Sequence, residues 1–361
     1  MPVAVPLSSY DYVPETKENL EWADLPTVDL SKIDTPEGKQ QQAQVLIDAV
    51  RTKGFFYVTG YAISQARIDA QFAIGQKFYE LPLEEKLKLV PDLESGDYNG
   101  YRPAGRRIID EKTGLTDRTE VFNLPKFLPH FAAKHANYPP IIADNIVEIE
   151  LFARDLHTYV LDPLFDLTSI ALGLPEHYLR DLHKYENLSE DHLRYMKYSK
   201  YSEEETAALG YLWGKGHTDL GTYTLLARQP VAALQIRDHT TGQWAWVKPQ
   251  NNTFTVNACD ALSFLTGGYI KSTIHRVAAP PVDQRHVDRL GLLYFARPKN
   301  DLVLSTIDAP VLKGKENEFE KQGLKVPTME EFVVAKQKWQ QGRGSKRNDT
   351  ILPGFHGLIF D

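Results

Sequence analysis

The sequence predicts an α+β protein whose core is a double-stranded β-helix, or jelly roll, with an N-terminal helical region and a C-terminal helix packed on it. Apolar residues recur at helical spacing in much of the first half of the 361-residue chain, whereas from about residue 193 they follow period two or form β-branched and aromatic runs. Eight such runs predict strands: residues 222–227, 231–236, 244–247, 253–256, 261–265, 272–277, 290–295 and 302–307. So many short strands in one block favour two packed sheets.

The first elements follow from composition and from capping residues. Residues 1–24 are rich in Pro, Ser and acidic side chains without a period, which predicts an extended arm, and residues 25–30 predict a short strand. Thr35, with Pro36 in the first turn, predicts the start of a helix that ends at Gly54. The order arm, strand, helix is therefore expected at the start of the chain.

The rest of the first half is predicted to be mainly helical. Residues 54–59 predict a second strand, and Ser64 predicts the cap of a second helix with one apolar stripe. Residues 97–105 contain two glycines and predict an irregular loop. Residues 141–173 have helical spacing throughout, so we expect one long helix that Pro163 could break.

Two local signals mark the second half. Residues 238–242 predict a hairpin connection between two strands. Residues 328–331, Thr-Met-Glu-Glu, form a capping box, and the helix that follows should bury Phe332, Val333 and Trp339. We therefore expect a helix that follows the strands in the sequence, near the C-terminus.

Composition excludes several classes of function. The formal net charge is −7 and the isoelectric point about 5.9, so the overall charge gives no support for nucleic acid as a partner. No stretch approaches the ~18 uncharged apolar residues of a membrane span, and the first 20 residues lack a signal-peptide pattern. Cys259 is the single cysteine, so no intrachain disulfide can form and a buried, unreactive thiol is expected. We expect a cytoplasmic protein that binds no membrane.

The tripeptide His217-Thr218-Asp219 and the distant His275 indicate a metal site. On a strand, residues i and i+2 face the same side, so His217 and Asp219 can bind one ion while Thr218 points away. Two imidazoles and one carboxylate occupy one face of a mid-first-row metal and leave other positions open, as in non-haem Fe(II) oxygenases. The alternative is a surface His-Asp pair and an unrelated core histidine.

The segments around these residues decide between the two interpretations. They closely resemble the isopenicillin N synthase-like family of Fe(II)- and 2-oxoglutarate-dependent oxygenases, and among these the thymine 7-hydroxylase type. The resemblance is carried by residues 214–226, 257–262, 271–281 and 289–295, and in the N-terminal half by residues 54–58, 78–86, 100–101 and 117–122. It covers about residues 25–298 in collinear order.

The resemblance implies roles for individual residues. His217, Asp219 and His275 would be the ligands of Fe(II). Arg289 and Tyr198 would hold the distal carboxylate of the co-substrate 2-oxoglutarate. The family usually has a serine two residues after this arginine, whereas this chain has Gly291, so one hydroxyl donor is missing. Another donor or a water could replace it, or the co-substrate could bind more weakly or differently.

Other candidates come from segments that approach the open side of the iron in this family, and each could equally be a core or surface residue. As possible substrate contacts we name Tyr101, Arg106, Phe122, Tyr195, Trp213 and Lys215.

The resemblance also divides the chain. We expect an N-terminal arm (1–24), the N-terminal region of the oxygenase family (25–130), a linking long helix (131–190), a jelly-roll oxygenase core (191–308) and a C-terminal helical segment (309–361). The last segment could act as a lid over the pocket or simply pack against it.

The function implied is that of a dioxygenase, an oxidoreductase that uses Fe(II), 2-oxoglutarate and O2. It would hydroxylate, desaturate or cyclise a small molecule, first a natural-product intermediate of secondary metabolism and second a nucleobase, and release succinate and CO2. Two alternatives stay open: an Fe(II) oxidase of the same fold that does not use 2-oxoglutarate, and a non-catalytic jelly roll that binds a small molecule. A monomer or weak homo-oligomer is expected.

Overall fold

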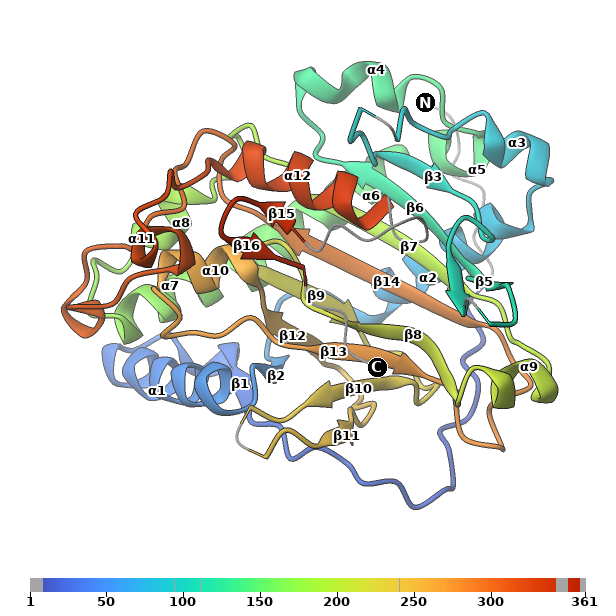
Figure 1. Cartoon of the computed structure of the whole chain (residues 1–361), viewed down its shortest axis with the longest axis horizontal. Helices are drawn as coiled ribbons and strands as arrows, with labels where there is room; N and C mark the ends of the chain where they lie inside the picture. The colour runs from blue at the N-terminus through green and yellow to red at the C-terminus, as the bar shows by residue number, and fades with distance from the viewer. Residues whose placement is uncertain (1–8, 94, 111, 240, 342–349, 358–361) are drawn as a thin grey trace.

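Two antiparallel-rich sheets form the centre of the molecule in the computed structural model, which describes residues 9–93, 95–110, 112–239, 241–341 and 350–357. Within these residues the larger sheet has eight strands, in the order β1 (Thr27–Asp29), β2 (Phe55–Thr59), β12 (Phe254–Ala258), β9 (Tyr223–Ala227), β14 (Arg289–Ala296), β7 (His192–Tyr198), β6 (Thr119–Pro125) and β3 (Gly100–Arg102). The smaller sheet has four, in the order β11 (Trp244–Trp246), β10 (Leu234–Arg237), β13 (His275–Ala278) and β8 (Leu212–His217). Figure 1 shows the strands of both sheets running across the view.

Helices cover the larger sheet. Helix α2 (Gln65–Glu80) packs against β14 and β7, and α1 (Pro36–Thr52) packs against β1, β2 and α7 (Asp162–Ala171). The remaining described α-helices are shorter or peripheral: α3 (Leu83–Leu87), α4 (Ala132–His135), α5 (Pro140–Ala143), α6 (Ile146–Leu156), α8 (Tyr178–Leu182), α9 (Glu203–Ala208), α10 (Asp260–Leu265), α11 (Glu318–Lys321) and α12 (Met329–Gln341). Two hairpins, β4 (Ile108–Asp110) with β5 (Leu115–Thr116) and β15 (Thr350–Leu352) with β16 (Phe355–His356), lie outside the two sheets.

The predicted caps at Thr35 and Thr328 and the predicted hairpin are confirmed, whereas the Ser64 side chain accepts no capping hydrogen bond from the described residues. The Thr35 side chain accepts a hydrogen bond from the Gly38 amide at the start of α1, and α2 begins directly after Ser64. In the capping box of α12, the Thr328 hydroxyl accepts from the Glu331 amide (3.2 Å) and the Glu331 carboxylate accepts from the Thr328 amide (3.0 Å). The predicted hairpin connects β10 and β11. Phe332 and Val333 are buried, and Trp339 is half-buried.

Two strand predictions were wrong. Residues 261–265 belong to helix α10, where Ala261, Leu262 and Leu265 are fully buried; a short apolar run that is buried on all sides has no period that separates strand from helix. Residues 302–307 join neither sheet. Their backbone hydrogen bonds are scattered, with the Leu304 amide donating to Pro327 and the Ile307 amide to Leu265.

The long helix predicted over residues 141–173 is interrupted. It consists of α5, α6, the π-helical turn His157–Leu161 and α7. Pro163 has no amide hydrogen to donate, and the wider turn directly before it accommodates this gap. The loop predicted at 97–105 contains the short edge strand β3, paired with β6.

The described part of the N-terminal arm contacts distant segments. The ring of Tyr10 stacks on Phe72 of α2 with 5.1 Å between centroids. The Gln284 amide donates to the Pro14 carbonyl (2.7 Å), and the Trp246 amide of β11 donates to the Glu21 carbonyl (2.9 Å). The arm therefore links the larger sheet's helical cover to the smaller sheet. Among the described residues, no helix combines the length and apolarity that crossing a membrane requires.

Candidate metal centre

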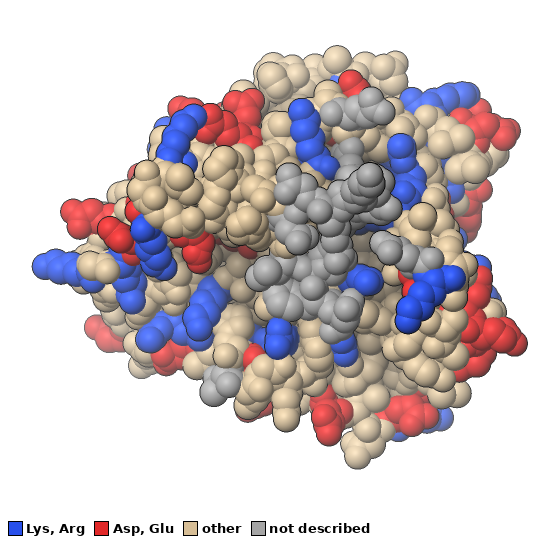
Figure 2. Space-filling model, in the orientation of Figure 1, with Lys and Arg blue, Asp and Glu red and all other residues tan. Residues whose placement is uncertain are grey.

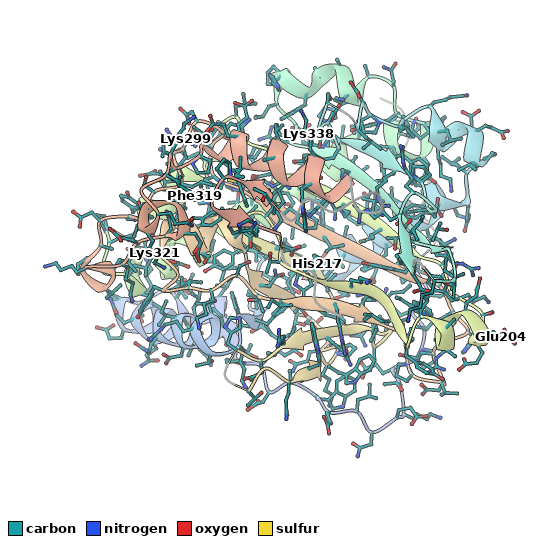
Figure 3. The ribbon with its side chains drawn as sticks, in the orientation of Figure 1. Glu204, His217, Lys299, Phe319, Lys321 and Lys338 are labelled. Carbon is teal, nitrogen blue, oxygen red and sulfur yellow. The ribbon has the colours of Figure 1, made fainter. Side chains whose placement is uncertain are left out.

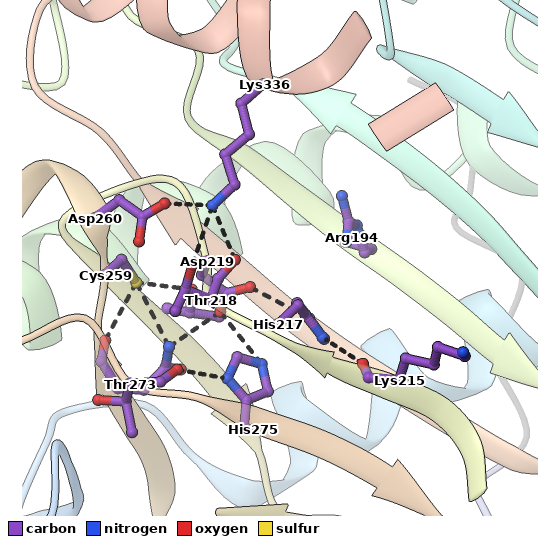
Figure 4. Close-up of polar contacts among 12 residues, drawn as sticks. Arg194, Lys215, His217, Thr218, Asp219, Cys259, Asp260, Thr273, His275 and Lys336 are labelled. Atoms are coloured by element: carbon purple, nitrogen blue, oxygen red, sulfur yellow. Dashed lines mark hydrogen bonds and ion pairs between the residues drawn. The ribbon is translucent and has the colours of Figure 1, made fainter. Parts of the chain in front are cut away.

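Three potential metal ligands meet at the smaller sheet. His217 is the last residue of β8 and His275 the first of β13, and the two are direct partners in the antiparallel ladder. Their rings lie 4.4 Å apart between centroids. Asp219 follows β8 by two residues and turns toward both rings (Figure 4). Figure 3 places His217 near the middle of the view, whereas Glu204 and Lys321 lie at the periphery.

The donor atoms are close enough to share one ion. His217 Nε2 lies 3.8 Å from Asp219 Oδ1, and His275 Nε2 lies 3.7 Å from Asp219 Oδ2. Donors that each lie about 2.1 Å from a metal can be up to about 4.2 Å apart. All three groups offer one potential ligand atom within 4.8 Å of the others, a spread that small side-chain movements bring within this limit.

Hydrogen bonds orient each of these groups. His217 Nδ1 lies 3.1 Å from the Lys215 carbonyl and His275 Nδ1 3.1 Å from the Thr273 carbonyl. A carbonyl only accepts, so each Nδ1 carries the hydrogen and each Nε2 keeps its lone pair for a metal. The Asp219 carboxylate accepts from the Thr224 hydroxyl (2.8 Å) and the Asn257 amide (3.0 Å).

The charge on Asp219 suits a cation. Burial alone would raise the pKa of its carboxyl group, but the attraction of His275 and His217 and the hydrogen bonds from Asn257 and Thr224 lower it well below its usual range. The carboxylate is therefore negative at neutral pH. Two oriented imidazoles and one carboxylate fit the ligand set of a non-haem Fe(II) centre with open positions.

Arg289 is a buried cation on the larger sheet. Its side chain is 5% exposed, its Nε has no hydrogen-bond partner among the described residues, and its guanidinium lies 5.3 Å from the centre of the Tyr198 ring. The two residues are direct partners between β14 and β7. Burial lowers the pKa of Arg289, whereas Tyr198 and Tyr10 act in the opposite direction, which indicates that both phenols lie near the guanidinium. A buried guanidinium with unused donor capacity is suited to an organic carboxylate.

At Gly291 a neighbouring side chain occupies the space a serine would need. A Cβ atom built there would lie 3.3 Å from Leu293 Cδ1 and 3.6 Å from Met196 Cβ. The Leu293 methyl group is therefore the atom that a side chain at this position would meet first.

A cavity of about 810 Å³ lies between the two sheets and reaches two of the three potential metal ligands. Its wall includes His217 and Asp219, Trp213 and Lys215 of β8, and Tyr198 of β7. Helix α12 contributes to the same wall. His217 and Asp219 therefore border a space large enough for a small organic molecule.

Two family models match the chain. The model described as the N-terminal region of the non-haem dioxygenase in morphine synthesis matches residues 25–146, and that of the 2OG-Fe(II) oxygenase superfamily matches residues 190–298. A UPF0676 protein of Schizosaccharomyces pombe is 30% identical over 79% of this chain and 85% of its own length. The chain belongs to the 2OG-Fe(II) oxygenase superfamily.

Other similarities agree with this family. The 2-oxoglutarate-dependent dioxygenase frbH of Dothideomycetidae sp. is 29% identical over 94% of this chain and 97% of that protein. The crystal structure of the full-length thymine 7-hydroxylase of Neurospora crassa in complex with alpha-KG has a TM-score of 0.75 at 22% identity, and covers 89% of this chain and 99% of that one. This 2OG-Fe(II) oxygenase is accordingly an oxidoreductase of the dioxygenase class, with Fe(II), 2-oxoglutarate and O2 as its cofactor and co-substrates.

The structure separates the six candidate substrate contacts of this oxygenase. Trp213 and Lys215 line the cavity, and Tyr101, Arg106, Phe122 and Tyr195 do not. The Tyr195 hydroxyl donates to Gln71 of α2 (2.7 Å), and Phe122 stacks on Phe78 of α2 (4.1 Å). Both rings therefore pack in the core between the larger sheet and α2, away from the cavity.

Tyr101 and Arg106 also lie away from this wall. Tyr101 pairs with Phe122 in the ladder between β3 and β6 and donates a hydrogen bond to Glu120. Arg106 is exposed in the turn before β4, and its neighbour Arg107 lines the cavity instead.

Sequence reasoning missed several cavity residues of this oxygenase. Arg194 lines the cavity, donates to Asn123 (2.7 Å) and lies over the Phe295 ring (4.3 Å), and no ion pair with a carboxylate is found for it in the described part of the chain. Strand alternation would have identified it, because Arg194 and Met196 share the face of β7 that carries Tyr198. No sequence pattern pointed to Thr224 and Asn257, which donate hydrogen bonds to Asp219.

Acidification is expected to weaken metal binding through the imidazoles rather than through Asp219. A group whose pKa is lowered by folding stays deprotonated until the pH falls further, so Asp219 keeps its charge in mild acid. Protonated imidazole cannot bind a metal, and histidines change charge between about pH 8 and pH 5. Anaerobic Fe(II) titrations should show an affinity at least about tenfold lower at about pH 5.5 than at about pH 7.5. A constant affinity across that range would contradict ligation by histidine.

Proposed function

We propose that this oxygenase binds Fe(II) through His217, Asp219 and His275 and 2-oxoglutarate through Arg289 and Tyr198, and that it oxidises a small molecule held in the cavity with release of succinate and CO2. The observation that carries the proposal is the convergence of three oriented donors, two of which, His217 and Asp219, line the cavity. The two facing sheets are then the halves of a jelly roll.

Each residue has a distinct task in this proposal. Iron and 2-oxoglutarate, when bound, supply the activation of O2 for attack on a substrate C–H bond. His217 and His275 hold the metal with their Nε2 atoms because their Nδ1 atoms are committed to carbonyls. Arg289 neutralises the distal carboxylate, and Tyr198 donates from a hydroxyl that stays protonated because burial raises its pKa. The sheet walls exclude water from the reacting centre.

The cavity indicates the kind of substrate. Its apolar wall includes Trp213, Val277 and Phe295, and Arg194 supplies a cation on the same wall. A partly apolar small molecule with an acceptor group fits this surface, which supports a natural-product intermediate before a nucleobase. On the face shown in Figure 2, basic and acidic side chains are interspersed, which favours neither nucleic acid nor another polyanion as partner. A cytoplasmic location and a monomer or weak homo-oligomer remain predictions.

Anaerobic addition of Fe(II) and 2-oxoglutarate tests the proposal. The complex should show a visible charge-transfer band and a higher melting temperature, because a ligand at a hundredfold excess over its Kd stabilises the folded state by about 2.7 kcal/mol. Air and a pool of small molecules should then give succinate. Substrate oxidation without succinate would favour the 2-oxoglutarate-independent oxidase, and the absence of both band and stabilisation would favour a non-catalytic binding protein.

Replacing Gly291 by serine should tighten 2-oxoglutarate binding. The added hydroxyl would stand where the family usually carries a donor, and one hydrogen bond contributes about 0.5–1.5 kcal/mol, or roughly twofold to twelvefold in Kd. The new Cβ requires Leu293 Cδ1 to move by a few tenths of an ångström. Spectroscopic titration of the Fe(II) protein with 2-oxoglutarate measures the change, with Leu293→Val as the control and Gly291→Ser/Leu293→Val as the relaxed variant. Unchanged affinity in both serine variants would show that the missing hydroxyl does not limit binding.

A further inference from the structure

A buried lysine of the C-terminal helix contacts the loop that carries the metal ligands. Lys336 of α12 is 3% exposed, and its Nζ donates to the Thr218 carbonyl (3.0 Å) and lies 3.3 Å from the Thr218 hydroxyl. It also forms an ion pair with Asp260, whose side chain is equally buried. A lysine is rarely buried so completely unless it is paired.

One partner of Lys336 belongs to the ligand loop, residues 217–219, and the other is hydrogen-bonded to it. Thr218 stands between His217 and Asp219, and its side chain faces α12 rather than the cluster, as strand alternation predicts. The Asp260 amide donates to the Asp219 carbonyl (3.0 Å), so the second partner holds the loop from the start of α10. Figure 4 shows Lys336 reaching down from α12 to these two residues beside Asp219.

We propose that Lys336 is a positioning residue, which fixes the backbone between His217 and Asp219 and so sets the geometry of the metal ligands. The proposal rests on the proposed function in that these residues bind the metal. It accounts for three polar contacts that meet at one buried ammonium group. It also makes α12 part of the site's framework.

The same helix supplies cavity wall next to its anchor. Gln337 follows Lys336 directly, Gln340 lies one turn further, and both line the cavity. Because the ammonium group holds α12 against Thr218 and Asp260, these two amides have a fixed place above the substrate space. In this proposal the helix serves as a fixed part of the wall rather than as a lid.

The test compares two buried lysines. Lys86 also forms a buried ion pair, with Glu120 (2.7 Å), but in the N-terminal region and without contact to the ligand loop. Lys336→Met and Lys86→Met are compared by melting temperature without metal, by Co(II) affinity and by the Co(II) absorption spectrum, which reports ligand geometry. Both variants should melt earlier than wild type. Lys336→Met alone should bind Co(II) about tenfold to a hundredfold more weakly, with an altered spectrum.

A double variant separates positioning from simple destabilisation. Lys336→Met/Asp260→Leu removes both charges and should melt closer to wild type, since an apolar pair can replace a buried ion pair. Its Co(II) affinity should remain low because nothing then holds the Thr218 carbonyl. Wild-type affinity and spectrum in either Lys336 variant would overturn the proposal. Wild-type protein that binds Co(II) no better than His217→Ala would instead refute the metal site itself.

Discussion

Replacing His217 by alanine should lower succinate formation by at least about a thousandfold while the fold persists. The metal contributes several kcal/mol to such reactions, and each 1.4 kcal/mol is a factor of ten in rate. His217 lies at the end of β8 and is only partly buried, so its loss removes a ligand but little packing. The measurements are succinate release, the charge-transfer band with Fe(II) and 2-oxoglutarate, and circular dichroism.

The exposed His286 provides the control for that variant. It lies in the loop before β14, where its backbone carbonyl accepts a hydrogen bond from Lys200, a contact that does not depend on its side chain. His286→Ala should therefore keep wild-type activity and spectra. Turnover by His217→Ala near the wild-type rate would remove His217 from the metal site, whatever the behaviour of the control.

Replacing Arg289 by methionine should raise the Kd of 2-oxoglutarate by about 10²- to 10³-fold. Loss of one partner of a buried charge pair costs about 3–5 kcal/mol, and each 1.4 kcal/mol is tenfold in affinity. Anaerobic titration of the Fe(II) protein measures the Kd, and saturating 2-oxoglutarate should recover much of the turnover. Arg289→Lys keeps the charge but not the planar guanidinium, so its Kd for 2-oxoglutarate should lie between those of wild type and Arg289→Met.

Arg285 supplies a matched arginine for the Arg289 experiment. Its guanidinium pairs with Glu203, whose side chain is largely exposed, and such surface pairs contribute little. Arg285→Met should leave the Kd of 2-oxoglutarate within about twofold of wild type. If Arg289→Met behaves the same way, the co-substrate carboxylate must bind elsewhere.

The helix caps and part of the candidate site were predictable because their sequence signals are local. Thr35 and Thr328 cap their helices through bonds to residues three positions away, so the sequence alone contains the whole interaction. The His-x-Asp spacing likewise fixes which way Thr218 points. His275 required the family resemblance, because its pairing with His217 joins strands 58 positions apart in the chain.

The features that the sequence did not predict have one physical cause. Where the local pattern of residues is compatible with more than one structure, tertiary packing decides which one forms. The four apolar residues of 261–265 are all buried in α10, and β8 is obscured in the sequence by Gly214 and Gly216. Tyr195 and Tyr198 are three positions apart on β7, so they face opposite sides of the sheet. Because Tyr198 faces the cavity, Tyr195 faces the helices and is a core residue. From the sequence alone, Lys336 would be placed on the surface, because only the packing of α12 against the ligand loop buries it.

The position of β2 in the larger sheet limits how this enzyme can be divided. β2 comes from the N-terminal region, yet it pairs with β12, and β12 supplies the Asn257 amide that bonds to Asp219. A fragment restricted to residues 190–298 would expose the open edges of β12 and β7 to aggregation. The two regions are therefore not independent. Exchanging the N-terminal segment for that of a relative also exchanges the strand that supports β12 and, through Asn257, the proposed ligand Asp219. Changes in substrate range by such recombination would then carry a change at the proposed iron site with them.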